Sequence, residues 1–464
     1  MRWRLSRWPD LQDVVARGKA QAGPEHDFTV KVEVGGLDPA TTYYYAFEAA
    51  GASSPVGRTR TAPSGPTTAL RLGVISCAHW AHGFFNAYRH VAEREVDLVV
   101  HLGDYVYEGD ESWAESGRVH RPSTRLRTLA DYRTRHAQYK TDPDLQRLHQ
   151  RHPMVAVWDD HEVAGNAWRD GAADHDPDED GPWPDRRAAA VRAYLEWLPV
   201  RSPDPSRPER IYRTVVLGDL VRLIMLDTRL EGRDRPEADG ERGVLTVDAP
   251  DRSLLGPEQR QWLQDELRAP SVWRMLGNQV MMAPLRVLDL PRPLDRLLPG
   301  AVAGGLGVNA GQWDGYPNER RRLFEFLERE AIADVVVLTG DLHSSWAAEL
   351  TLDPDERRPA VGVEFVAPSV TSRSFAEEVA PPVPGSRALL RLLIARQNPH
   401  LPFFDLERHG YLVVDVDRHR VQAEWWYVDT VTERAAGERL GGRWSVRRGE
   451  ARLVPADDPE EAGG

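Results

Sequence analysis

Short apolar runs recur along most of the chain and alternate with stretches in which apolar residues follow helical spacing. Runs of this length that are rich in Val, Ile and Leu are typical of buried strands, whereas FFNAYRHVAERE at 84–95 has the spacing of an amphipathic helix. The alternation predicts an α/β or α+β domain built on a substantial sheet. The predicted strands are LRLGVIS (70–76), VDLVVHL (96–102), MVAVW (154–158), VRLIML (221–226), VWRMLGNQVMM (272–282), DVVVLTG (334–340), VGVEFV (361–366) and GYLVVDV (410–416).

The first sixty residues have strand character of a different kind. FTVKVEV (28–34) alternates strictly, GLDPATT (36–42) carries turn residues, and YYYAFEAA (43–50) predicts a second strand. The GL-x-P-x-T-x-YYY pattern resembles a fibronectin type III domain, which implies a small β-sandwich. Few residues precede Phe28, so we expect this sandwich to be abbreviated.

These patterns of apolar and polar residues divide the chain into three parts. We expect an N-terminal β-domain over 1–66, a larger domain over 67–455 and a disordered acidic tail over 456–464. A segment rich in Pro, Ser and Thr at 61–68 is the natural linker between the first two.

Composition excludes some classes of protein. The 464 residues include 59 Lys plus Arg against 72 Asp plus Glu, and a net charge of −13 argues against a general affinity for nucleic acid. No run is long and apolar enough to span a membrane, and MRWRLSRWPDLQD lacks the apolar core of a secretory signal. We therefore expect a protein that is cytoplasmic as given, or secreted if its N-terminus is incomplete. The oligomeric state stays open.

Metal-competent side chains gather where the predicted strands end. One such residue at a strand end is ordinary, because a Gly-Asp often makes a turn and an isolated Cys usually packs as a small hydrophobe. Recurrence at five strand ends favours a shared site, since ligands collect at such ends. The side chains are Cys77, Asp104 with Tyr107, Asp159 with Asp160 and His161, Asn278, and Asp341 with His343.

The spacing within these motifs suits a pair of metal ions. Asp104 and Tyr107 are three residues apart in GDYVY, so a tight turn can return both oxygens to one ion. Asp341 and His343 are two apart in GDLH and share a face of extended backbone. An aspartate between two cations can bridge them, and two ions about 3.5 to 4 Å apart can clamp a phosphoryl group and activate a water molecule.

The ordered series SC, GDYVY, DDHE, LGNQVMM and GDLHSSW resembles the metallophosphoesterase signature in the form of the alkaline phosphatase D (PhoD-like) family. LDTR, WDGYP, EFVAPSVTS and HGYLVVDV also look like segments of this family, and the resemblance covers about residues 28–428. It implies a four-layer αββα sandwich and metal-dependent hydrolysis of a phosphate monoester or diester.

The resemblance also implies roles for individual residues. Cys77, Tyr107 and His343 would bind a first ion, expected to be ferric iron, and Asp104 would bridge to a second. Asp160 and Asp341 would bind that second ion, calcium in the family, although another divalent metal or a larger cluster stays open. His161 would be the catalytic residue, acting on the phosphoryl group or the leaving oxygen.

Two further residues are candidates for substrate binding. Arg229 in LDTR could clamp a phosphate, but it could equally form a structural ion pair with Asp227. Asn278 in GNQ stands near the position where related enzymes carry a histidine ligand, so we expect it to touch the second ion or the phosphate.

Other mechanisms fit the sequence less well. A cysteine-dependent phosphatase needs C-x5-R, but Gly83 stands where the arginine would be. No G-x-S-x-G follows a strand, which argues against a serine hydrolase. The remaining rival is a binding or surface protein with a metallophosphoesterase-like body that does not turn over, and retention of the complete ligand set argues against it.

Overall fold

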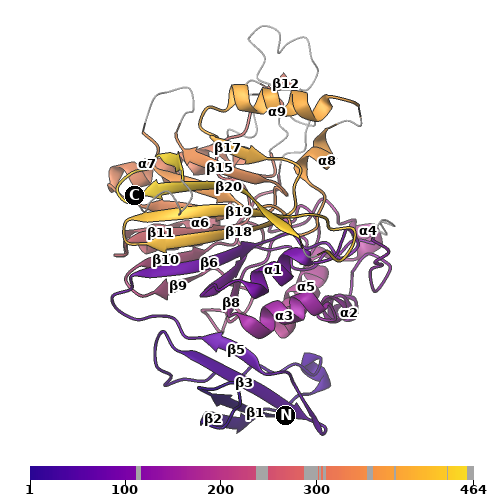
Figure 1. Ribbon diagram of the computed structural model, residues 1–464. Helices are drawn as coiled ribbons and strands as arrows, with labels where there is room; N and C mark the ends of the chain where they lie inside the picture. Colours follow the sequence, from indigo (N-terminus) through magenta and orange to yellow (C-terminus); the bar gives the residue numbers. More distant parts are fainter. Residues whose placement is uncertain are drawn as a thin grey trace.

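Two seven-stranded sheets form the centre of the large domain in the computed structural model (Figure 1). The structure describes residues 1–110, 116–236, 249–286, 301–302, 305–306, 310–352, 359–380, 383–435 and 437–456. The predicted tail beyond residue 456 lies outside these residues.

The first sheet combines an N-terminal and a C-terminal stretch of the chain. Three parallel strands, β6, β7 and β8, continue into an antiparallel set through the pairing of β6 with β18. Its strands in spatial order are β21 (Leu453–Pro455), β20 (Glu438–Arg447), β19 (Arg420–Val428), β18 (Gly410–Asp417), β6 (Ala69–Ile75), β7 (Leu98–His101) and β8 (Met154–Ala156).

The second sheet comes from the middle of the chain. Neighbouring strands β10, β11, β14 and β16 are parallel, and antiparallel strands complete both edges. The order is β17 (Phe403–Asp405), β15 (Ser345–Leu350), β16 (Gly362–Val366), β14 (Val335–Thr339), β11 (Trp273–Asn278), β10 (Val221–Met225) and β9 (Arg213–Leu217). Two short strands, β12 (Ala301–Val302) and β13 (Gly305–Leu306), pair only with each other.

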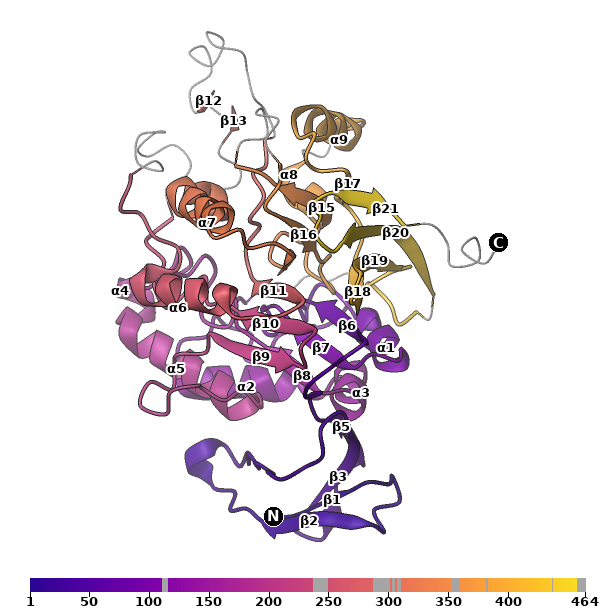
Figure 2. The ribbon, with the colours of Figure 1, turned by 90° about the vertical axis from the view of Figure 1, so that its left-hand side faces the viewer.

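Helices cover the outer faces of both sheets, which completes the four layers (Figure 2). Helix α1 packs on β18 and β19 of the first sheet, and α6 and α7 share an apolar cluster with outward-facing residues of the second. Together with the short 3-10 segments η1 (Pro24–His26) and η3 (Trp313–Gly315), the helices are α1 (Asn86–Glu93), α2 (Leu129–Tyr139), α3 (Pro143–Arg151), α4 (Pro177–Asp180), α5 (Trp183–Trp197), α6 (Gly256–Arg268), α7 (Pro317–Arg329), α8 (Phe375–Val379) and α9 (Ser386–Gln397).

The apolar runs in the sequence are buried on both faces of their sheets. Leu223 and Met225 of β10 belong to the core that includes the first sheet, whereas Ile224 between them belongs to the cluster under α6 and α7. A strand buried on both sides needs a continuous apolar run, because successive side chains point to opposite faces. Residues 223–226, LIML, show this pattern after Arg222 near the start of the strand.

The N-terminal residues form a separate β-domain below the large one (Figure 1). One sheet holds β1 (Arg2–Ser6), β2 (Val14–Lys19), β3 (Thr42–Ala49), β4 (Ala52–Ser53) and β5 (Gly57–Arg60), and the described residues of this domain contain no second sheet. The strand expected at 28–34 is not formed, because no described strand pairs with it. The alternating pattern fits a strand, but the alternation alone does not provide a neighbouring strand.

Among the described residues, no helix combines the length and apolar character that crossing a bilayer requires.

Trp425 of β19 ties the two sheets together and provides a test of the layered core. It is fully buried, its indole Nε1 donates to the Val366 carbonyl of the second sheet at 2.9 Å, and its ring packs on Phe365 and Phe403. We expect Trp425→Ala to lower the free energy of unfolding by about 3 to 5 kcal/mol in chemical denaturation. Leu440→Ala on β20 removes a part-exposed side chain and should cost far less; equal losses would contradict this role of Trp425.

Candidate metal centre

The predicted ligands meet where strands of both sheets end. Cys77 follows β6, Asp104 follows β7 and Asp160 follows β8, all in the first sheet, while Asp341 and His343 follow β14 in the second. The site therefore lies between the sheets, at the carboxyl ends of their parallel strands. This is the edge at which ligands bind in α/β folds.

A left-handed backbone turn accompanies four of these residues. The φ angles are 61° at Cys77, 54° at Asp104, 58° at Asp341 and 52° at His343. Residues other than glycine adopt this conformation in only a few per cent of cases, Asn, Asp and His more often than the rest, and each instance costs about 1 to 3 kcal/mol. Such turns gather at functional sites, which is consistent with these loops being shaped for their side chains rather than for stability.

Three overlapping groups of donor atoms could each hold a metal ion. Within each group the ligand atoms lie within 4.8 Å of one another, and Asp104 and Asp160 each belong to two groups. The groups among the described residues are Cys77 with Asp104 and His343, Asp104 with Asp160 and His161, and Asp159 with Asp160 and Asp341.

Tyr107 joins the first of these groups. Its hydroxyl donates to Asp104 Oδ2 at 2.9 Å, lies 3.4 Å from His343 Nε2 and accepts from Ser372 Oγ at 2.6 Å. The six residues predicted as ligands are thus brought together, although the structure does not test which of them binds which ion.

Burial of several carboxylates at one place shapes the electrostatics. Burial raises the pKa of Asp104 to about 6, with neighbouring Asp160 and Asp341 adding to the effect and His161 opposing it. Burial likewise raises the pKa of Asp159 well above its ordinary value. Asp160 Oδ1 is buried and accepts no hydrogen bond from described residues. Buried carboxylates of this kind need a cation, so the oxygen, nitrogen and sulfur donors present fit metal binding.

Arg229 supplies one positive charge to the carboxylates from the buried side of the site. Its guanidinium is fully buried, binds both oxygens of Asp159, lies 3.4 Å from Asp160 Oδ1 and contacts Asp341. Burial lowers its pKa, but the three aspartates raise it more, so the pKa ends well above the usual value. Asp227 instead accepts the backbone N–H groups of Arg229 and Leu230. The predicted phosphate contact of Arg229 stays a prediction.

His161 is held by a carboxylate that the sequence did not single out. Its Nδ1 lies 2.7 Å from Glu108 Oε2, and Glu108 Oε1 accepts the Gly165 N–H at 2.6 Å. Burial lowers the pKa of His161, but Glu108 and the nearby aspartates raise it by a larger amount, so its pKa lies well above the ordinary value. With Nδ1 engaged, Nε2 is the ring nitrogen left for another partner.

Glu162 fixes the backbone of two ligand loops at once. Its Oε2 accepts the N–H groups of Asp104 at 3.0 Å and Asp159 at 2.8 Å, and its Oε1 accepts that of Tyr105 at 2.6 Å. Glu108 and Glu162 each stand next to a motif residue, in YVYE and DDHE, but the sequence gives no sign that they are buried.

Asn278 ends β11 beside Thr339 of β14, and its side chain is bound to neighbours in the interior. Its amide oxygen accepts from Trp313 Nε1 at 3.2 Å and its amide nitrogen donates to Thr339 Oγ1 at 3.2 Å. The side chain is fully buried and is not among those that line the cavity over the carboxylates. Its predicted contact with the second ion or the phosphate is untested.

A cavity of about 870 Å³ opens onto the donor groups. Asp104, Tyr107, Asp160, His161, Asp341 and His343 contribute to its wall, together with the stacked rings of His79 and His82, whose centroids are 3.6 Å apart. Trp168 lines the cavity, with Arg235 5.6 Å from its ring centroid. The volume exceeds that of a phosphate group and leaves room for an organic substituent.

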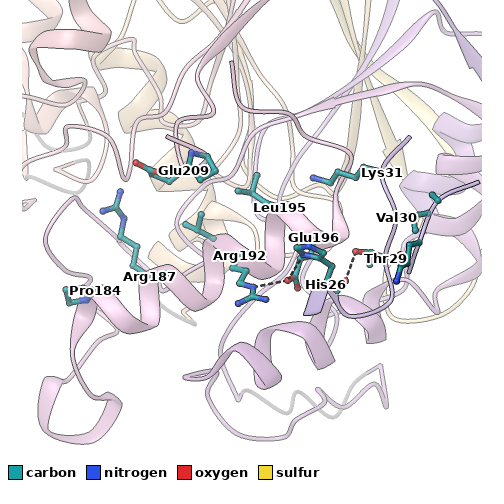
Figure 3. Close-up of a pocket in the computed structure, with 15 residues that line it drawn as sticks. His26, Thr29, Val30, Lys31, Pro184, Arg187, Arg192, Leu195, Glu196 and Glu209 are labelled. Carbon is teal, nitrogen blue, oxygen red and sulfur yellow. Dashed lines mark hydrogen bonds and ion pairs between the residues drawn. The ribbon is translucent and has the colours of Figure 1, made fainter. Parts of the chain in front are cut away.

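A second cavity, of about 940 Å³, lies between the N-terminal domain and α5 (Figure 3). Its wall combines apolar residues of α5 with His26, Lys31 and Glu196. None of the three donor groups contributes to it, so it is not the predicted centre.

Comparisons with known proteins agree over almost the whole chain. The sequence model of a family described as PhoD-like phosphatase matches residues 72–425, and that of the PhoD-like phosphatase N-terminal domain matches residues 1–63. Alkaline phosphatase D of Bacillus subtilis (strain 168) is 34% identical over 450 residues, which cover 94% of this chain and 72% of that protein.

Solved structures give the same result. A structure of PhoD superposes with a TM-score of 0.85 at 32% identity and covers 98% of this chain and 85% of the other. Purple acid phosphatase PPD1 from yellow lupin (Lupinus luteus) seeds has a TM-score of 0.51 at 12% identity, with 89% of this chain and 61% of the other covered. This second likeness concerns the fold alone.

Replacement of Glu162 tests how the ligand loops are held. Glu162→Gln turns one acceptor oxygen into a donor, so at least one buried N–H loses its partner. We expect a loss of about 1 to 3 kcal/mol in the free energy of unfolding, together with lower metal content in elemental analysis.

Glu364→Gln is the matched control. Glu364 is also buried and accepts the N–H groups of Met282 and Ala283, but it does not line the cavity. This variant should lose stability and keep its metal. Equal metal loss in both variants would show that Glu162 acts only through general stability.

Proposed function

The chain belongs to the PhoD-like phosphatase family, and from that premise we propose that it hydrolyses phosphate esters at a centre of ferric iron and calcium. Membership makes the chain a phosphatase; the metals, the residue roles and the substrate range are our proposal. The observation that carries it is the convergence of six potential ligands from strand ends of both sheets.

The donor chemistry divides the site into two halves. The thiol of Cys77, the phenol of Tyr107 and the imidazole of His343 lie close to the Asp104 carboxylate, a set suited to ferric iron. Asp160 and Asp341 supply carboxylates on the other side, a set suited to calcium. Asp104 belongs to groups on both sides and is assigned as the bridge. When bound, the two ions would supply Lewis acidity and make water nucleophilic near neutral pH.

His161 is assigned as the group that acts on the substrate. It lines the cavity, and the Glu108 carboxylate accepts the Nδ1–H, orients the ring and favours the imidazolium form, in which Nε2 also carries a proton. In this arrangement Nε2 can give a proton to the leaving oxygen of the ester. Glu108 is a positioning residue, because it reaches the substrate only through the imidazole.

The cavity has room for esters larger than a simple monoester. Its volume of about 870 Å³ and the presence of Trp168 and Arg235 at its wall support hydrolysis of both monoesters and diesters. Rates with p-nitrophenyl phosphate and bis-p-nitrophenyl phosphate, measured with defined metals, test this breadth. The rival assignment, a binding protein without turnover, requires no hydrolysis of either ester under any metal condition.

Selective chelation tests the two-metal assignment. Calcium held by carboxylates exchanges more readily than ferric iron held by thiolate, phenolate and imidazole. EGTA should abolish hydrolysis of p-nitrophenyl phosphate without removing a visible absorption band, and added calcium should restore the rate. Tyr107→Phe should lose the band. An active protein that is free of iron and indifferent to EGTA would contradict both metal assignments.

The dependence of rate on the leaving group tests His161 and Glu108. His161→Ala should lower turnover by about 10²- to 10⁴-fold, as general-acid loss does, while the protein keeps both metals. The loss should be larger with phenyl phosphate than with p-nitrophenyl phosphate, because the poorer leaving group needs the proton more.

Glu108→Gln should show the same leaving-group dependence with a smaller loss, and Glu364→Gln should show none. Metal loss in proportion to activity in His161→Ala would instead make His161 a ligand.

A further inference from the structure

The most regular strand pattern of the N-terminal domain lies outside its sheet. Residues 29–35 run without a turn or bend, and exposure alternates along them: Lys31 and Glu33 are exposed, whereas Val30, Val32 and Val34 are half-buried. This is the period of two that a β-strand shows. The segment therefore has the exposure pattern of a strand, but it pairs with no described strand.

The backbone edge of this segment is open. Among the described residues, none donates a hydrogen bond to or accepts one from the backbone of residues 30–34. A row of unpaired N–H and C=O groups on an extended chain is a template for an incoming strand. The segment borders the cavity of about 940 Å³, whose opposite wall is α5; Figure 3 shows Thr29, Val30 and Lys31 beside it.

The sequence of the segment complements itself in the antiparallel direction. If Val32 lies opposite Val32 of a second strand, Val30 faces Val34, and Lys31 faces Glu33 in both halves of the pair. Opposite charges directly across an antiparallel pair stabilise it, and like charges destabilise it. We propose that residues 30–34 pair with the same residues of a second copy of this chain, across a twofold axis at Val32.

Both charged side chains have capacity for such a contact. The Lys31 ammonium donates to the Val200 carbonyl at 2.9 Å and has two further N–H groups. Glu33 Oε2 binds Arg201 at 3.1 Å in an exposed ion pair, which leaves Oε1 for a partner. The pairing therefore adds cross-strand contacts without breaking those that the chain already makes.

A second copy fits this edge better than an unrelated peptide. The pattern of charge and valine needed in the incoming strand is the one that the segment itself carries, and a twofold arrangement uses each interaction twice. Phe28 next to the segment is also exposed, at 63%, so pairing brings further apolar surface close to the interface.

Charge exchange tests the proposal directly. Sedimentation equilibrium over a wide range of protein concentration should show a monomer–dimer equilibrium that Lys31→Glu or Glu33→Lys each weakens roughly tenfold or more, because like charges then face each other twice. The double variant K31E/E33K should regain the original affinity. A mixture of the two single variants should form a heterodimer, because one copy then offers two glutamates and the other two lysines.

Lys19→Glu on β2 is the matched control, since it changes the same charge outside the segment and should leave the equilibrium unaltered. Equal melting temperatures across the variants exclude unfolding as the cause. Any of three results would overturn the proposal. The protein could stay monomeric at every concentration, or its dimerisation could be unaffected by K31E. Alternatively, each single variant could be weakened while neither the double variant nor the mixture of single variants restores the affinity.

Discussion

The gathering of four aspartates at one point, three of them buried and Asp341 half-buried, is the constraint on which the rest of the site depends. Asp104, Asp159, Asp160 and Asp341 are largely withdrawn from water, and carboxylates at such distances repel one another. Arg229 balances part of this charge from the interior, and the cavity side is left for cations that come from solution. The fold thus supplies enough positive charge to bring the carboxylates together but not enough to satisfy them.

Hydrogen bonds between the strand-end loops hold this arrangement in a strained backbone. The Cys77 N–H donates to Gly103 O at 3.2 Å and the Ala78 N–H to Asp104 O at 2.9 Å, so the loops after β6 and β7 support each other. Thr371 and Ser372 donate their N–H groups to the Cys77 carbonyl. Left-handed turns persist only where surrounding structure over-determines them, and these bonds provide that support.

The sequence predicted the family and the fold class, and both are confirmed. The strands could be predicted because doubly buried strands leave continuous apolar runs, and the gathering of the candidate ligands could be predicted because these residues follow those runs. Glu108 and Glu162 were not predicted as site residues, because their roles depend on burial and on hydrogen bonds to groups distant in the chain. The strand predicted at residues 28–34 was wrong for a related reason. Alternation is a property of one segment, but a segment becomes a β-strand only when it pairs with a second one.

The pairing of β6 with β18 has a consequence for the order in which the protein is made. Every residue assigned as a ligand has been synthesised once the ribosome passes His343, and β6 already has β7 along one side. Cys77 follows β6 directly, and the other side of this strand stays unpaired until β18 (Gly410–Asp417) emerges from the ribosome. Completion of the first sheet is therefore a late event, and a chain ended before β18 would contain all of the proposed ligands but lack the strands that support β6 on that side.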